Sequence, residues 1–279
     1  MGFSIAALNI YSCHANRQCR DFPELMLPAF IYPIAGTILG LIVGSFLATI
    51  VIRWPQRQSV ISGRSRCDSC NESLRAIDLI PVFSYLLRSG KCASCGAVIN
   101  SDHLVIELGA GLIGGLALFA ASGVEGLMGA IFGWVLITLA ALDAQHHWLP
   151  DKLTLLLAVC GLAASLWVDE PDLVNRAIGG VAGFLALFLI GWSYRLLRGR
   201  EGLGGGDPKL LGAVGCWLGW SALPFVLLGA GLVGLAAVMM MHSRGQAVAA
   251  DSALPLGTFM AITAFPLWIV QTMIGGNLL

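Results

Sequence analysis

Two carboxylates in this chain could carry out chemistry. The stretch GLGGGDPKLLG, residues 202–212, places Asp207 among glycines, and LAALDAQHHWLPDKLT, residues 139–154, contains Asp143 and Asp151. A charged carboxylate near hydrocarbon costs about 2.5–3.5 kcal/mol on insertion scales, so such residues tend to be functional. Two carboxylates within hydrogen-bonding range share one proton, because like charges so close resist double ionisation. One can then activate a water while the other polarises a carbonyl, as in aspartic peptidases.

Each aspartate taken alone has a simpler interpretation, as a helix-end cap or a solvated loop charge. Asp143 and Asp207 together, at one face of a membrane, favour catalysis instead. The glycines Gly204, Gly205 and Gly206 would let the backbone of an extended peptide substrate approach closely. The sequence therefore predicts a carboxylate pair that acts on a peptide.

A second group of reactive side chains is a pair of Cys-x-x-Cys motifs, CDSC and CASC, separated by twenty-one residues. Four thiolates from two such motifs suit the tetrahedral geometry of structural zinc. Disulfides are disfavoured in a reducing cytosol, and four unligated buried cysteines are the remaining alternative. A loop this small has little core of its own and benefits from a metal. The predicted zinc ligands are Cys67, Cys70, Cys92 and Cys95.

The other four cysteines give weaker signals. Cys160 and Cys216 fall in apolar runs, where packing is the expected role of a cysteine. Cys13 and Cys19 fall in the N-terminal tail, where a disulfide and two free thiols both stay open.

The elements that must position these residues are apolar helices. The chain is 57% hydrophobic and 11% charged, whereas soluble domains are about a quarter charged. About 20 apolar residues cross a hydrocarbon core of about 30 Å, and helices satisfy their own backbone in lipid. We predict an all-α polytopic membrane protein with about eight transmembrane helices, of which the sixth is short. The apolar runs are 28–52, 103–121, 125–142, 153–168, 174–194, 209–219, 222–241 and 256–276. The first 27 residues lack the pattern of a cleavable signal peptide.

Charge placement predicts the orientation of these helices. Thirteen of the sixteen Lys and Arg residues lie in or beside four loops on one side, namely 53–102, 143–152, 195–208 and 242–255. The positive-inside rule makes these loops cytoplasmic and puts both termini outside. The acidic loop with Asp169, Glu170 and Asp172 then falls outside, in agreement with this orientation.

These signals divide the chain into four parts. Residues 1–27 form an outside tail, residues 28–52 the first transmembrane helix, and residues 53–102 a small cytoplasmic domain with four cysteines. Residues 103–279 form the multi-helix membrane domain that carries the carboxylate pair.

Several ordered motifs resemble those of one family. GGGDPK is similar to the Gly-x-Gly-Asp signature of membrane aspartyl peptidases, and residues 36–260 resemble bacterial type IV prepilin peptidases (leader peptidase and N-methyltransferase). The other motifs that carry the resemblance are GSFLATIVIRWP at 44–55, LIPVFSYLLRSGKC at 79–92, the Leu-Asp-x7-Asp element at 142–151 and LPLGTF at 254–259.

The resemblance implies roles for individual residues. Asp143 and Asp207 match the catalytic aspartates, whereas Asp151 and Lys209 match supporting residues. Such enzymes remove a basic leader from prepilins or type II secretion pseudopilins, after a glycine at the cytoplasmic face of the bacterial inner membrane. Many then methylate the new N-terminus with S-adenosylmethionine. The implied partners are these substrates and the lipid bilayer, and no nucleic acid.

The chain departs from the family pattern in its N-terminal half, which the resemblance associates with methyl transfer. Ala48 stands where asparagine is usual. SDHLVIE at 101–107 replaces Arg-Tyr-Pro-x-x-Glu, with His103 and Leu104 at altered positions. Positions with a candidate cofactor-binding role are Gly44, Arg53 and Glu107. A structural role, as a close-packed glycine or a snorkelling arginine, is an equal alternative.

Two other classes of protein fit parts of the pattern. Intramembrane carboxylates also mark ion or proton pathways, so a transporter or channel is one alternative, although no repeat of the hydrophobic pattern supports it. A non-enzymatic assembly platform, whose cysteine loop docks a pilus motor, is another. For the peptidase, the acidic residues Asp68, Glu72 and Asp78 could help to dock a basic leader.

Overall fold

The computed structural model describes residues 30–60, 69, 70, 72, 73, 81–99, 101–200, 202–245 and 254–275 of the 279-residue chain. In these residues the regular elements are helices, accompanied by one isolated antiparallel bridge between Lys91 and Val98. The helices are α1 (Ile31–Arg53), α2 (Phe83–Leu87), α3 (Ser101–Ala120), α4 (Gly123–His146), α5 (Asp151–Ala163), α6 (Leu173–Arg198), α7 (Asp207–Leu218), α8 (Leu223–Ser243) and α9 (Leu256–Ile274). The predicted tail, residues 1–27, lies outside the described residues, and so do Cys13, Cys19, Cys67, Asp68 and Asp78.

The all-α membrane architecture is confirmed. Among the described residues, six helices are long and apolar enough to cross a bilayer, namely α1, α3, α4, α6, α8 and α9. The predicted fourth and sixth spans are helical too, but α5 and α7 have only 13 and 12 residues. At 1.5 Å per residue they are about 20 Å long, shorter than a hydrocarbon core of about 30 Å. The chain is therefore a multi-pass membrane protein in which two helices are too short to span by themselves.

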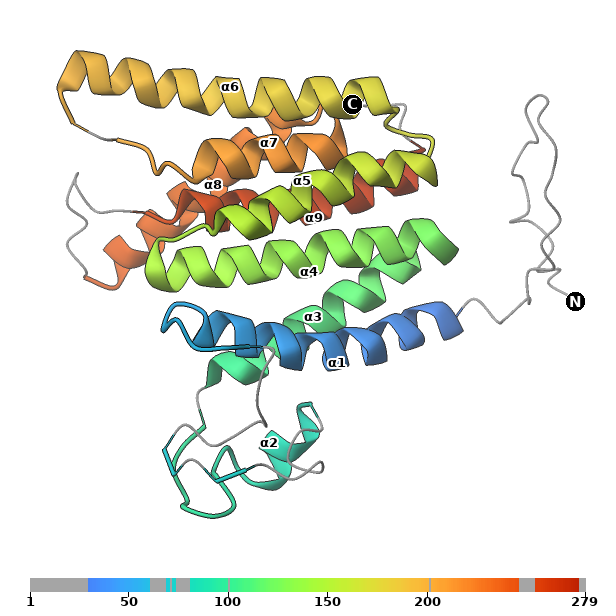
Figure 1. Cartoon of the computed structure of the whole chain (residues 1–279), viewed down its shortest axis with the longest axis vertical. Coiled ribbons are helices and arrows are strands. Elements are labelled where there is room, and N and C mark those ends of the chain that lie inside the picture. Colours follow the sequence, from blue (N-terminus) through green and yellow to red (C-terminus); the bar gives the residue numbers. More distant parts are fainter. Residues whose placement is uncertain are drawn as a thin grey trace, which may run out of the picture.

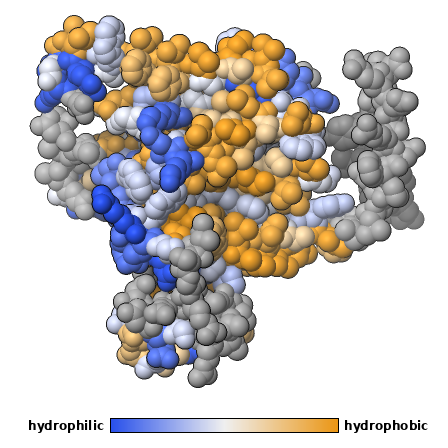
Figure 2. All heavy atoms as spheres, in the orientation of Figure 1, coloured by the Kyte–Doolittle hydropathy of each residue, from blue (hydrophilic) through white to orange (hydrophobic). Residues whose placement is uncertain are grey.

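The helices form a layered bundle (Figure 1). α1 and α3 lie at one edge, α4, α5 and α9 in the middle, and α6 at the opposite edge beside α7. The short helix α2 lies outside the bundle, beyond α1 and α3. Hydrophobic side chains cover most of the visible lateral surface, whereas hydrophilic ones gather toward the end where α4 meets α5 and α6 meets α7 (Figure 2). This end, at the left in Figure 1, is called the polar end below.

Glycines allow two helix pairs to pack backbone to backbone. Gly36, Gly40 and Gly44, spaced four residues apart on α1, face α3: a Cβ on Gly36 would lie 2.3 Å from the carbonyl oxygen of Gly114. On α6, a Cβ on Gly179 would lie 2.4 Å from the oxygen of Gly215 in α7. Small residues at four-residue spacing allow such close approach between membrane helices, whose association depends on packing. The α6–α7 contact fixes the helix that begins with Asp207.

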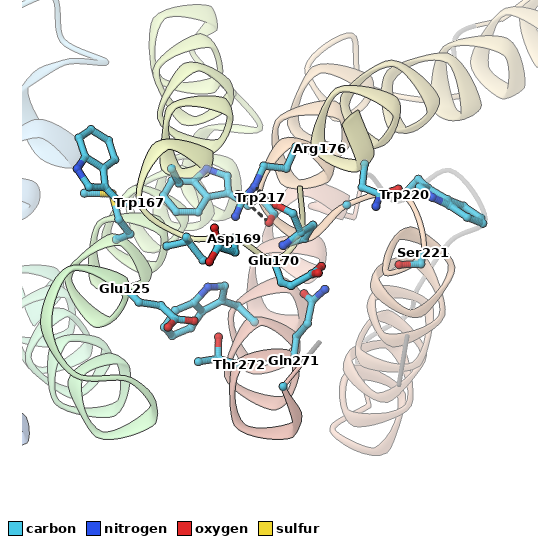
Figure 3. A pocket seen from close by; sticks show the side chains of 18 residues that line it. Glu125, Trp167, Asp169, Glu170, Arg176, Trp217, Trp220, Ser221, Gln271 and Thr272 are labelled. Atoms are coloured by element: carbon cyan, nitrogen blue, oxygen red, sulfur yellow. Dashed lines mark hydrogen bonds between the residues drawn. The ribbon is translucent and has the colours of Figure 1, made fainter. Parts of the chain in front are cut away.

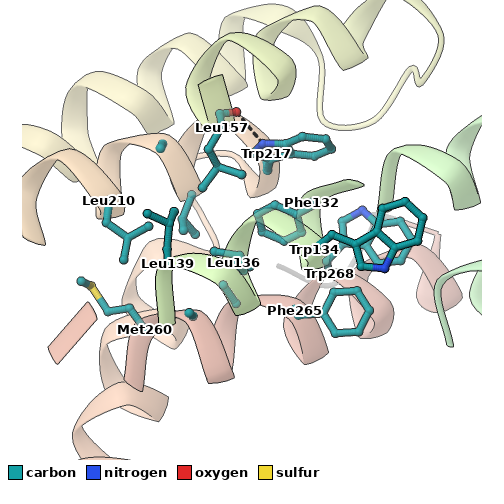
Figure 4. Close-up of a cluster of buried hydrophobic side chains, with 14 of the residues drawn as sticks. Phe132, Trp134, Leu136, Leu139, Leu157, Leu210, Trp217, Met260, Phe265 and Trp268 are labelled. Carbon is teal, nitrogen blue, oxygen red and sulfur yellow. Dashed lines mark hydrogen bonds between the residues drawn. The ribbon is translucent and has the colours of Figure 1, made fainter. Parts of the chain in front are cut away.

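A hydrophobic core joins α4, α5, α7 and α9 (Figure 4). Phe132 of α4 stacks on Trp217 of α7, with ring centroids 4.9 Å apart. The indole N–H of Trp217 donates to the carbonyl oxygen of Leu157 in α5 at 2.7 Å, so the polar tip of this buried ring is satisfied. Leu139 and Met260 are fully buried in the same cluster. The four helices that this core holds together are those that position the candidate site.

Arg176 of α6 ties down the ends of the two short helices. Only 2% of its surface is exposed, and its guanidinium donates to the carbonyl oxygens of Pro171, Gly161, Cys216 and Trp217. An unsatisfied carbonyl in a bilayer costs several kcal/mol, so these bonds stabilise helix ends that stop short of the membrane surface. A cavity of about 570 Å³ opens beside Arg176, opposite to the polar end (Figure 3).

Candidate active site

Asp143 and Asp207 come together at the polar end of the bundle. Asp143 lies in the last turn of α4, and Asp207 is the first residue of α7. Asp143 is 5% exposed and Asp207 is 7% exposed. The two carboxylates are close enough to interact electrostatically. Two aspartates that are 64 positions apart in the chain thus form one buried acidic pair.

The first turn of α9 holds both members of this pair. The N–H of Thr258 donates to Asp143 Oδ2 at 2.8 Å, and Thr258 Oγ1 lies 3.1 Å from the same oxygen. The backbone of Gly257, the preceding residue, and that of Gly204 lie close enough to the carboxylate of Asp207 to stabilise its charged form. The first four N–H groups of a helix have no partner within the helix. Asp143 therefore caps α9, and the backbone of the adjacent Gly257 lies close to Asp207.

A polar cavity opens onto the pair. Its volume is about 1290 Å³, larger than the roughly 300–1,000 Å³ of small-molecule sites. Its lining comes from residues 147–152 around the start of α5, from Arg200 and residues 202–207 before and at the start of α7, from Leu254 and Leu256, and from Trp54 after α1. Trp54 and Trp148 meet edge to face, with ring centroids 6.2 Å apart. The space suits a chain segment with several residues.

The glycine loop before Asp207 has the close contacts that its composition predicts. A Cβ on Gly206 would lie 2.7 Å from Leu149 Cβ, and a Cβ on Gly204 would lie 2.9 Å from Asp207 Oδ2. A Cβ on Gly205 would have no neighbouring heavy atom within 4 Å, so this glycine faces open space. Gly204 and Gly206 bring the loop against its neighbours, whereas Gly205 leaves the cavity open.

The two predicted supporting residues pair with each other. Lys209 Nζ lies 2.6 Å from Asp151 Oδ1, so the ion pair joins the first turn of α7 to the first residue of α5. Both side chains are substantially exposed, at 44% for Lys209 and 73% for Asp151. Asp151 lines the same cavity as the buried pair. Asp151 is exposed, whereas Asp143 is buried and hydrogen-bonded to α9.

Three of the four predicted metal ligands fall in the described residues and lie together. The sulfur atoms of Cys70, Cys92 and Cys95 are all within 4.8 Å of one another. Cys92 and Cys95 lie in a tight turn, in which the N–H of Gly96 donates to the oxygen of Cys92 at 3.0 Å and Gly96 takes a positive φ of 69°. Thiolates at these separations fit a tetrahedral ion with metal–sulfur distances of about 2.3 Å. This cysteine cluster could hold a metal.

The candidate cofactor positions do not line the cavity around the acidic pair. Gly44 packs directly on Glu107, since a Cβ on Gly44 would lie 2.8 Å from Glu107 Cα. Glu107 is 7% exposed, and its Oε2 accepts the N–H of Val82 at 2.8 Å. Arg53 lies in the last turn of α1. The lining of the cavity around Asp143 includes none of Gly44, Arg53 and Glu107.

Sequence reasoning missed the part played by Gly257 and Thr258. The motif LPLGTF at 254–259 contains both residues, and it entered the sequence argument only as part of a family resemblance. The available signal was a glycine and a threonine two and three residues after a proline, at the start of an apolar run. Such a helix start lacks a capping side chain of its own, and its free N–H groups require acceptors from elsewhere.

The fold and the site together define an all-helical, multi-pass membrane protein with a buried pair of aspartates at one end of its bundle. Two family models match the chain: "Bacterial Peptidase A24 N-terminal domain" over residues 38–121, and "Type IV leader peptidase family" over residues 130–239. The chain belongs to the type IV leader peptidase family.

Curated relatives match most of the chain. The "Prepilin leader peptidase/N-methyltransferase" of Burkholderia pseudomallei strain 1026b is 38% identical over 264 residues, which is 84% of this chain and 84% of the relative. The protein of that name from Dickeya chrysanthemi is 36% identical over 91% of this chain and 96% of its own length. The one from Neisseria gonorrhoeae is 35% identical, with 86% and 92% covered. No solved structure matches the chain.

Proposed function

We propose that this chain is a membrane aspartic endopeptidase that removes the leader from type IV prepilins or type II secretion pseudopilins, after a glycine. The observation that carries the proposal is the buried pair Asp143 and Asp207, held at the start of α9 and open to a large cavity. The names and extensive similarity of the curated relatives support the substrate class.

The pair supplies the groups that peptide hydrolysis needs. With one proton shared between them, the ionised carboxylate takes a proton from water, and the resulting hydroxide adds to the scissile carbonyl carbon. The protonated carboxyl donates a hydrogen bond to the carbonyl oxygen as negative charge develops there. Collapse of the tetrahedral intermediate breaks the C–N bond, and the departing amine takes a proton from the pair. Gly205, which faces open space beside Asp207, leaves room for a substrate backbone.

In this proposal the polar end faces the cytoplasm of a bacterial inner membrane, and both termini lie outside. Every long helix that ends at the polar end has a basic residue in its last turn: Arg53 in α1, His146 in α4, Arg195 and Arg198 in α6, and His242 in α8. Helices α3, α5, α7 and α9 run the other way and have none there. The positive-inside rule counts Lys and Arg, so the arginines at the ends of α1 and α6 are the part of this asymmetry that supports the orientation.

The test is processing of a prepilin in membranes that contain the full-length protein. Asn is nearly isosteric with Asp but cannot shuttle the proton, so Asp143→Asn and Asp207→Asn should each abolish cleavage while the protein still inserts. Asp172→Asn is a matched control, since Asp172 caps α6 through the N–H of Asn175, and asparagine caps as well as aspartate. Full cleavage by either pair variant would refute the assignment.

The proposal includes N-methylation of the new N-terminus, a metal site and a supporting ion pair. S-adenosylmethionine would supply the methyl group, and Gly44, Arg53 and Glu107 are the candidate residues of this chain for that activity. Zinc would be held by Cys70, Cys92 and Cys95 together with Cys67. Asp151 and Lys209 would support the site by fixing the starts of α5 and α7 relative to each other.

A further inference from the structure

The environment of Asp143 contains a polar side chain with no assigned role. Thr258 directs two groups at one carboxylate oxygen, since its N–H lies 2.8 Å and its Oγ1 lies 3.1 Å from Asp143 Oδ2. Thr258 Oγ1 also lies 3.0 Å from the carbonyl oxygen of Ala140, one turn earlier in α4. The hydroxyl carries one hydrogen, and an ionised carboxylate is a stronger acceptor than a neutral carbonyl.

We infer that Thr258 is a positioning residue of the catalytic pair: its hydroxyl and N–H fix Asp143 Oδ2 and stabilise the pair's negative charge. The inference rests on the proposed peptidase function. Because both donors converge on Oδ2, the other oxygen, Oδ1, receives neither of them. The N–H of Thr258 can only donate, so Oδ2 must keep a lone pair toward it.

Gly257, the residue before Thr258, lies close to both carboxylates of the pair. The N–H of Thr258 donates to Asp143, and the backbone of Gly257 lies close to the carboxylate of Asp207, so one stretch of backbone is near both members of the pair. The N–H groups on either side are already bonded, since that of Leu256 donates to the oxygen of Leu254 and that of Phe259 to the oxygen of Pro255. The positive end of the α9 dipole also favours negative charge at this point.

The charged side chains near Asp143 come from the lining of the cavity and from Lys209 of α7, which pairs with Asp151. Asp207 comes from α7, Asp151 and Lys152 come from the start of α5, and Arg200 comes from the connection before α7. His147, directly after α4, lines the same cavity, and α9 has no charged residue. Thr258 is thus the side chain through which α9 acts on the charge of the pair.

The test compares Thr258→Val with Thr258→Ser in the purified full-length protein, with a prepilin peptide as substrate. Valine keeps the shape and the N–H but removes the hydroxyl, and serine restores it. The acidic limb of the pH profile of kcat/KM should move upward by roughly half to one pH unit in Thr258→Val, which lowers cleavage about three- to tenfold below the limb. Thr258→Ser should return the limb to its original position.

Thr263→Val is a matched control on the same helix, because the Thr263 hydroxyl donates only to the oxygen of Phe259, one turn earlier. Its pH profile should equal that of the original protein. If Thr258→Val does not accumulate as folded protein, Thr258→Ala removes the same hydroxyl without added bulk. An unshifted acidic limb in a folded variant that lacks the hydroxyl overturns the inference. Loss of the proposed function itself looks different, since the unmodified protein would then fail to cleave or Asp143→Asn would stay active.

Discussion

Lys209 and Asp151 form an ion pair at 2.6 Å, although each was predicted separately as a supporting residue. This ion pair connects the first turn of α5 to the first turn of α7 and does not include Asp143 or Asp207. A contact between two exposed side chains contributes little, typically about 0–1 kcal/mol.

Asp151→Asn should therefore reduce prepilin cleavage only a few-fold, far less than Asp143→Asn. The physical reason is that asparagine removes half of an exposed ion pair and leaves the buried carboxylates in place. Lys209→Gln should behave in the same way. Processing in membranes followed by gel shift measures both effects, and an inactive Asp151→Asn beside an active Asp143→Asn would move the catalytic role to position 151.

Gly257→Ala should lower the rate of cleavage by about tenfold or more. A tenfold loss corresponds to a barrier that is about 1.4 kcal/mol higher. A Cβ on Gly257 would lie 2.9 Å from Leu149 Cδ1 and 3.0 Å from Asp143 Oδ2, so the carboxylate or the backbone of α9 must shift. Gly231→Ala in α8 is the control, since nothing lies within 4 Å of that position. Equal activity of the two variants in a cleavage assay would contradict the close packing of Gly257 against the pair.

The cysteine cluster should bind one zinc per chain, through Cys70, Cys92 and Cys95 with Cys67. Metal analysis of the purified protein should find zinc, and Cys67→Ser with Cys92→Ser should lose both the metal and the fold of this region. A structural zinc in a small site contributes roughly 10–16 kcal/mol, so the loss should be evident. Cys160→Ser in α5 should keep the metal. Protein without zinc, or an unchanged fold in the double variant, would count against the site.

Glu107→Ala should reduce methylation of the new N-terminus and leave cleavage nearly intact. Glu107 binds the N–H of Val82 near the cysteine region, and it does not line the cavity around Asp143. Glu107→Gln keeps an acceptor for Val82 and separates the loss of that contact from the loss of charge. Mass spectrometry of the processed product measures both activities, and equal loss of the two would argue against separate sites.

The sequence predicted the site best where the signal was local. The Gly-x-Gly-Asp and Leu-Asp-x7-Asp motifs pointed to Asp143 and Asp207, and apolar runs marked their helices. Asp143 was expected at the end of a span at 142, but α4 continues to His146, because polar residues can extend a helix beyond its apolar part. The contact between Thr258 and Asp143 was not predictable, since it joins residues 115 positions apart.

The end of α5 shows a second limit of prediction from the sequence. Hydropathy suggested a fourth span as far as residue 168, but α5 ends at Ala163 and passes through a 3-10 turn to Leu166. Nothing near Ala163 indicates this end. Its stabilisation comes from Arg176 of α6, whose Nη1 lies 3.0 Å from the oxygen of Gly161.

The short helices bound to Arg176 give the protein an uneven hydrophobic thickness. α1 and α3, with 23 and 20 residues, match a full bilayer, whereas α5 and α7 cover about 20 Å. Hydrophobic mismatch of this kind is relieved by tilt or by local thinning of the lipid. Of the two short helices, α7 is buried, whereas α5 exposes apolar side chains such as Leu155 and Val159. Lipid beside α5 would therefore be thinner than lipid around α1 and α3, and a substrate helix that approaches the pair along α5 would have less hydrocarbon to leave.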